Sequence, residues 1–102
     1  MPVDEANLSG KVKREPTALA PGSVLECKVC LFRDDDGGYT VQAARLPGAI
    51  SEGETAEEAL DNIRDALASL LRSYIEAGEP IPWTPVEFDR APDLERWVPV
   101  NV

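Results

Sequence analysis

The 102-residue sequence contains no histidine, only two cysteines and one methionine, and few aromatic residues (6% of the chain). Without histidine, the chain lacks the side chain that most often transfers protons near neutral pH. Cys27 and Cys30 have C-x-x-C spacing, but a four-ligand zinc site needs a second cysteine pair or histidines, which are absent. The composition therefore predicts no metal, no cofactor and no catalytic residues.

The two cysteines lie in a stretch whose hydrophobic residues alternate as in a β-strand. Three steps along a strand cover about 10 Å, whereas a disulfide joins Cα atoms no more than about 7 Å apart. An odd number of steps also places the two side chains on opposite faces of the strand. We therefore expect free thiols that pack as small hydrophobic residues.

Long hydrophobic runs and positive charge are also scarce. No run approaches the roughly 20 residues of a membrane span, and residues Met1 to Glu5 lack the features of a secretory signal, so we expect a cytoplasmic protein. Lys and Arg number 10 against 19 Asp and Glu, a net charge of −9. Direct DNA binding is not expected, because it requires clustered basic residues. The acidic excess leaves two alternatives open, a basic partner or simple solubility.

The pattern of hydrophobic residues divides the chain into two parts. Residues 1–23 show no periodicity and contain Pro16, Pro21 and Gly22, which predicts a flexible N-terminal tail. The basic cluster of the tail (Lys11, Lys13 and Arg14) is interpreted as solvated rather than as a nucleic-acid-binding arm. Residues 24–102 are predicted to form a single domain.

Alternating hydrophobic residues predict a β-hairpin at the start of this domain. Val24–Phe32 and Tyr39–Arg45 are the two strands, and the Asp- and Gly-rich stretch between them is the turn. Pro47 and Gly48 end the second strand, and residues 49–52 are expected to form a short third strand. Short strands are also expected at residues 86–88 and 97–100, the latter at a sheet edge because of Pro99.

A helix of about 22 residues is the clearest local prediction. Thr55 and Glu58 have the spacing of a capping box, and Gly78 is the expected C-terminal stop. Between them, hydrophobic residues recur at helical spacing: Leu60, Ile63, Leu67, Leu70, Leu71, Tyr74 and Ile75. The sequence therefore predicts an α+β fold, in which one long helix packs on an antiparallel sheet of three to four strands (β-β-β-α-β).

Acidic residues gather at the turn and around the helix start, and they are the predicted contacts for a basic partner. The local alternative is that turns favour Asp and helix N-termini favour Glu. Catalysis by Asp34–Asp36 is not expected, because consecutive carboxylates in a flexible turn are not held rigidly. The predicted contact residues are Asp34, Asp35, Asp36, Glu52, Glu54, Glu57 and Glu58.

A single helix covers only one face of such a sheet. Cys30 and Phe32, with Val24, fall on the other face of the first strand. We therefore predict that these three residues form an oligomer interface in a homodimer or homotetramer.

Four short motifs, spaced along the chain, resemble those of a known protein family. They are Asp36-Gly37-Gly38-Tyr39, Leu46-Pro47-Gly48, Gly53 to Ala59, and Gly78 to Pro82. Together they resemble the family of HicB-like antitoxins over roughly residues 24–82. The resemblance implies a partial RNase H fold and a non-enzymatic protein that binds a HicA-like toxin. Such toxins are small, basic, and cleave messenger RNA with a histidine.

The chain departs from the family pattern at its C-terminal end. Many members carry a DNA-binding helix-turn-helix or ribbon-helix-helix there, whereas residues 79–102 are few and contain five prolines. Operator binding is therefore not expected. The alternative function is that of an oligomeric regulatory or scaffold protein of the same fold, without a toxin partner.

Overall fold

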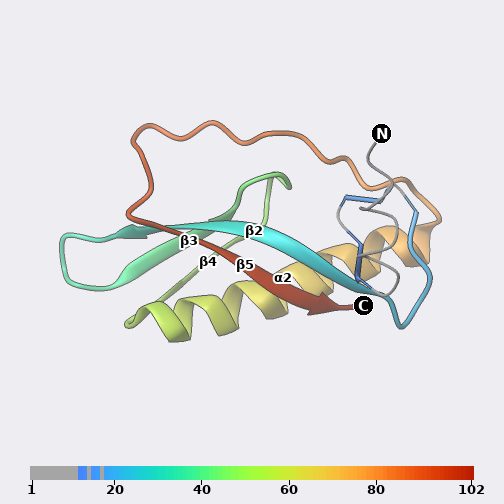
Figure 1. Cartoon of the computed structure of the whole chain (residues 1–102), viewed down its shortest axis with the longest axis horizontal. Helices are drawn as coiled ribbons and strands as arrows, with labels where there is room; N and C mark the ends of the chain where they lie inside the picture. Colours follow the sequence, from blue (N-terminus) through green and yellow to red (C-terminus); the bar gives the residue numbers. More distant parts are fainter. Residues whose placement is uncertain (1–11, 14, 17) are drawn as a thin grey trace.

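The computed structural model describes residues 12–13, 15–16 and 18–102. In chain order the elements are β1 (Val12–Lys13), β2 (Val24–Arg33), β3 (Tyr39–Ala43), β4 (Ile50–Gly53), α2 (Ala56–Ala77) and β5 (Leu94–Asn101) (Figure 1). Four strands form an antiparallel sheet in the order β5-β2-β3-β4, and α2 packs on one of its faces. This confirms the predicted α+β fold.

Strand β2 is the centre of the sheet. Its residues Val24–Leu31 pair with β5 on one edge, and residues 29–33 pair with β3 on the other edge. The two-residue strand β1 runs parallel to the start of β2, opposite Val24 and Leu25. The sequence did not predict β1, because two residues are too few to show alternation.

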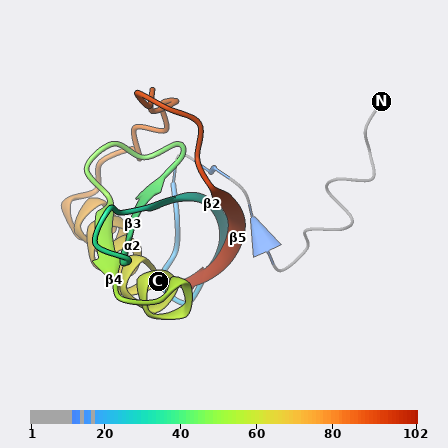
Figure 2. The ribbon, with the colours of Figure 1, turned by 90° about the vertical axis from the view of Figure 1, so that its left-hand side faces the viewer.

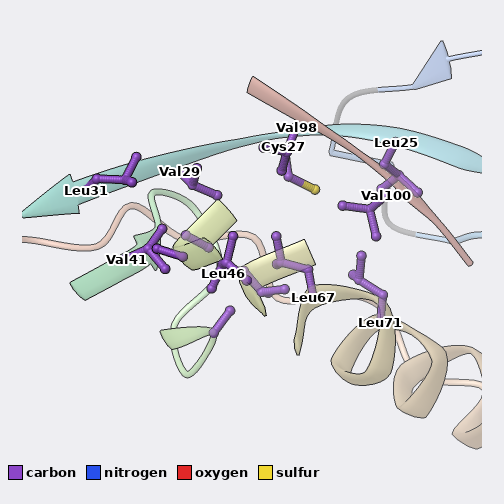
Figure 3. Packing of buried hydrophobic residues seen from close by; sticks show 14 of the residues in the cluster. Leu25, Cys27, Val29, Leu31, Val41, Leu46, Leu67, Leu71, Val98 and Val100 are labelled. Carbon is purple, nitrogen blue, oxygen red and sulfur yellow. The ribbon is translucent and has the colours of Figure 1, made fainter. Parts of the chain in front are cut away.

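Helix α2 covers the face of the sheet to which the odd-numbered residues of β2 point. Its N-cap is Thr55, and it ends at Gly78, which has a φ of 69°, a conformation that glycine adopts without strain. Both predicted helix ends are confirmed. The fully buried residues shared by helix and sheet include Leu25, Val29, Leu31, Val41, Ile63, Leu67, Leu71 and Val100 (Figure 3).

Part of the opposite face of the sheet is covered by the chain itself, which buries two of the three residues predicted as an oligomer interface, Cys30 and Phe32. The interface itself stays a prediction. Residues 78–93, here called the linker, connect α2 to β5. They begin beside the C-terminal end of the helix, where Ile81 joins the core, and then cross the side of the sheet away from the helix (Figure 1). The Phe88 ring packs against the Phe32 ring with 5.1 Å between centroids. Cys30 and Phe32 are consequently only 3% and 7% exposed within a single chain. Val24 is half-buried beside β1 and β5.

The linker has no regular secondary structure. The predicted strand at residues 86–88 is therefore wrong, although the backbone N–H of Val86 donates to the carbonyl of Ala44 at 2.9 Å. Prolines at positions 80, 82, 85 and 92 remove the N–H donors that a longer pairing would need. Strand β5 extends beyond the predicted residues 97–100, and β3 ends at Ala43 rather than at Arg45.

Parts of the predicted tail contact the domain. Glu15 forms an ion pair with Arg45 at 2.7 Å, and the Trp83 indole donates to the carbonyl of Pro16 at 2.8 Å. Leu19 packs against the hydrophobic core. Residues 1–11 and Arg14 lie outside the described residues, and with them most of the basic cluster. The division of the chain at residue 23 stays a prediction.

Both cysteines are free and buried, as expected. Cys27 belongs to the core between β2 and α2 (Figure 3), and Cys30 points to the linker side of β2. Burial raises the pKa of the Cys27 thiol to about 12, and the negative charges of Glu26 and Glu15 add to the effect. Burial also raises the pKa of the Cys30 thiol.

We expect the native protein to resist thiol reagents. At pH 8, a thiol with a pKa near 12 holds about a thousandfold less thiolate than one with the ordinary value of 9.0. Ellman's reagent should therefore react slowly with the folded protein and rapidly in denaturant. Because the pKa is raised on folding, the corresponding stability is complete below pH 9 and is lost as the pH rises towards 12. Fast reaction of both thiols at pH 8 would contradict the buried placement.

Candidate functional site

An open hollow of about 630 Å³ lies at one end of the molecule, where the β2–β3 turn, the end of β4 and the start of α2 meet. Figure 2 looks onto this end. We call it the acidic hollow, because five of its lining residues are acidic. Its lining consists of Asp34, Asp36, Gly37, Gly38, Tyr39, Glu52, Gly53, Glu54, Glu58 and Asn62.

The β2–β3 turn is shaped by its own polar groups. The Asp34 backbone N–H donates to the carbonyl of Gly38 at 2.7 Å, and Gly37 adopts a φ of 98°. The Thr40 hydroxyl donates to the Asp34 carboxylate at 3.0 Å, and Asp36 accepts a bond from the backbone N–H of Gly38 at 3.2 Å. These bonds fix two of the five carboxylates at the rim of the hollow.

The start of α2 supplies another wall. The Glu58 backbone N–H donates to the Thr55 hydroxyl at 3.1 Å, which confirms the predicted cap. The Glu58 carboxylate turns back and accepts a bond from the backbone N–H of Glu54 at 2.6 Å. One turn further along, the Asn62 amide donates to the carbonyl of Glu52 at 2.8 Å and ties β4 to the helix.

Two glycines allow these walls to approach one another. A Cβ on Gly53 would lie 2.4 Å from the backbone nitrogen of Ala59, so only glycine fits between β4 and the helix. A Cβ on Gly38 would lie 3.1 Å from the carbonyl oxygen of Gly53. The hollow therefore depends on backbone contact between the turn, β4 and α2.

Five of the seven predicted contact residues come together in this hollow. Asp35 and Glu57 are exposed but do not line it. Within the described part of the chain, none of the seven carboxylates forms an ion pair with Lys or Arg. The hollow therefore concentrates negative charge that the domain does not neutralise by direct contact.

Tyr39 and Asn62 line the acidic hollow but were missed in the sequence. Asn62 follows Glu58 by four residues on a capped helix, so helical spacing was a usable signal. Tyr39 was predicted only as the first residue of a strand and as part of the turn motif. Its hydroxyl accepts a bond from the Arg33 guanidinium at 3.2 Å, a contact that the strand pattern does not reveal.

The acidic side chains do not form a metal centre. Among the described residues, no three His, Cys, Asp or Glu side chains are grouped closely enough to hold a metal ion. No described helix is both long and apolar enough to cross a membrane. What the hollow offers chemically is a negatively charged concave surface for a positively charged group.

Residues 27–100 match a family model described as the HicB-like antitoxin of bacterial toxin–antitoxin systems. The UPF0150 protein Ta0767 of Thermoplasma acidophilum is 39% identical over 54 residues, which are 53% of this chain and 78% of that protein. The UPF0150 protein ssr1765 of Synechocystis sp. is 34% identical over 64 residues, 63% of this chain and 81% of that protein. Antitoxin HicB of Escherichia coli K12 is 40% identical over 54 residues, 53% of this chain and 39% of that protein.

A solved structure shares the fold. The N-terminal domain of the Burkholderia pseudomallei antitoxin HicB superposes with a TM-score of 0.54 and 29% sequence identity. The superposition covers 76% of this chain and 96% of that domain. Against the structure of the Burkholderia pseudomallei antitoxin HicB, the TM-score is 0.56, and the superposition covers 62% of that chain. The similarity is therefore to the N-terminal domain of the antitoxin.

Proposed function

This chain belongs to the family of HicB-like antitoxins of bacterial toxin–antitoxin systems, and from that premise we propose that it neutralises a small, basic HicA-like toxin. It would do so in the cytoplasm, without catalysis, by covering the active face of the toxin. The observation that carries the proposal is the acidic hollow. Its five acidic residues come from three elements and have no Lys or Arg ion-pair partner among the described residues.

The physical basis is charge complementarity. A concave surface with one sign of charge attracts an oppositely charged protein and speeds its association. The net charge of −9 acts in the same direction at longer range. Because β4 and α2 are in backbone contact at Gly53, the surface is held in place before binding, which lowers the entropic cost of association.

The experiment that tests the proposal is co-expression with a HicA-like protein from the same organism. Induction of the toxin alone should arrest growth, and induction together with this chain should restore it. The purified proteins should form a complex, for which a toxin with its histidine replaced serves as a non-toxic probe. Persistent growth arrest, with no complex at micromolar concentration, would refute the proposal.

The second candidate is a regulatory or scaffold protein of the same fold that assembles with itself and has no toxin partner. The comparison that bears on it is that the matched region makes up 78–81% of the two UPF0150 proteins but 39% of the E. coli antitoxin, so this fold forms most of some relatives. Because the linker covers Cys30 and Phe32, self-association would need other residues. A defined oligomer in light scattering, without toxin binding, would favour this candidate.

A further inference from the structure

A second hollow, of about 430 Å³, lies on the face of the sheet opposite α2, between β2, β3 and the linker. We call it the linker hollow. It borders the acidic hollow, because Asp34 lines both. Its lining consists of Phe32, Asp34, Thr40, Gln42, Glu87, Phe88, Asp89 and Arg90.

Several contacts hold the linker against the sheet beside this hollow. Phe88 packs on Phe32, and the Arg90 guanidinium donates to the carbonyl of Arg33 at 2.9 Å. The Asp93 carboxylate accepts a bond from the backbone N–H of Arg33 at 2.7 Å, which holds the pKa of that carboxyl below its usual value. The hollow is therefore a built feature of the fold, although the linker has no regular secondary structure.

The linker hollow combines aromatic and acidic groups. Its apolar part is chiefly the half-buried Phe88 ring, because the Phe32 ring behind it is only 7% exposed. Glu87 and Asp89 are exposed carboxylates on its linker side. Ile50 pairs with Gln42 across β3 and β4, so its side chain lies on the same face, and it is 54% exposed. Ile50 therefore adds an exposed apolar side chain to the face of the sheet that carries the linker hollow, without lining the hollow itself.

We propose that the linker hollow binds an arginine- or lysine-bearing segment of the same basic partner that occupies the acidic hollow, an inference that rests on the proposed function. Long basic side chains place their aliphatic stems on apolar surface and their charge on carboxylates, which matches this combination of groups. Because the Arg90 guanidinium already lies 5.3 Å from the centroid of the Phe32 ring, a partner's side chain would pack on Phe88 and pair with Glu87 and Asp89.

The negative charge of the linker hollow disfavours two other occupants, a second copy of this chain and nucleic acid. A second copy of this chain, at net charge −9, would bring further negative charge to Glu87 and Asp89. Nucleic acid would be repelled for the same reason. A basic protein is the macromolecule whose charge complements both hollows, and Asp34 joins them into one continuous surface.

The test compares three double variants in titrations with the purified HicA-like protein whose histidine is replaced. Glu87→Lys/Asp89→Lys alters the linker hollow, and Glu52→Lys/Glu54→Lys alters the acidic hollow. Asp65→Lys/Glu76→Lys makes the same change in net charge at exposed positions of α2 that line neither hollow. We expect the linker variant to bind about tenfold more weakly than wild type and the control to stay within about twofold. Ile50→Ser should weaken binding by about fivefold, through the lost apolar contact.

The outcomes separate this inference from the proposed function. If Glu52→Lys/Glu54→Lys weakens binding while Glu87→Lys/Asp89→Lys and Ile50→Ser do not, the partner uses only the acidic hollow and the inference is wrong. If the wild-type chain does not bind the toxin, both proposals are wrong. Circular dichroism melts of the variants check that each remains folded, which the exposure of the substituted side chains leads us to expect.

Discussion

Replacing Gly53 with alanine is expected to lower the melting temperature of the protein by roughly 10–20 °C. The added Cβ would lie 2.4 Å from the nitrogen and 2.9 Å from the Cα of Ala59, and 2.8 Å from the carbonyl carbon of Glu58. All three are backbone atoms, so no side-chain rotation relieves the clash, and β4 must move away from the helix. We expect a cost of about 3 kcal/mol in the free energy of unfolding.

Gly37→Ala is the control for this substitution. Gly37 has a φ of 98° and open space where a Cβ would stand, so alanine there adds only backbone strain, about 1 kcal/mol. Thermal melts of both variants measure the difference. If Gly53→Ala melts at the same temperature as Gly37→Ala, the close approach of β4 to α2 is not as described.

Reversing two charges of the acidic hollow is expected to weaken toxin binding by about a hundredfold at low salt. Glu52→Lys/Glu54→Lys suits this test because neither side chain forms a hydrogen bond or an ion pair within the described part of the chain. The bonds at these two residues involve the carbonyl of Glu52 and the backbone N–H of Glu54. Stability should therefore change little, while the association rate falls.

The salt dependence of binding shows whether the double variant binds weakly because charge attraction is lost or because its fold is damaged. Raising the ionic strength screens exposed charges, so wild-type binding should weaken with salt more steeply than binding of the double variant. Surface plasmon resonance at two salt concentrations measures both slopes. Parallel slopes for the two proteins, or an equal loss in Asp65→Lys/Glu76→Lys, would mean that the acidic hollow does not mediate the contact.

Helix α2 was predictable from the sequence to the residue, because its signals are local. Thr55 and Glu58 contact one another across a single turn, and Gly78 ends the helix by its own backbone conformation. The alternation of β2 was also predictable, although the strand extends one residue beyond the predicted end, to Arg33. Patterns of this kind need no knowledge of distant parts of the chain.

The linker was not predictable in the same way. Its position on the sheet depends on the contact of Phe88 with Phe32, 56 residues earlier, and on the bond from Arg90 to the carbonyl of Arg33. Neither contact leaves a periodic signal, and the prolines of this segment indicate only irregular structure. The sequence therefore suggested a partly uncovered sheet face, whereas the linker covers the part of this face around Cys30 and Phe32.

The acidic hollow was predictable from the sequence only in part. Individual acidic residues were identifiable because turns and helix starts favour them, but their grouping depends on strand register. Tyr39 pairs with Gly53, and this pairing brings the β2–β3 turn beside the end of β4 and the start of α2. Asp35 and Glu57 belong to the same sequence clusters, yet they do not line the hollow. Sequence spacing alone does not distinguish the two groups.

The pairing of β5 with β2 has a consequence for how the protein folds during synthesis. Val24 pairs with Asn101 and Leu31 with Leu94, so the central strand acquires β3 as a neighbour early and β5 only after residue 101 has left the ribosome. Contacts of such long sequence separation are formed slowly. Until then, the nascent chain presents an unpaired edge of β2, which is the kind of surface that chaperones protect from aggregation.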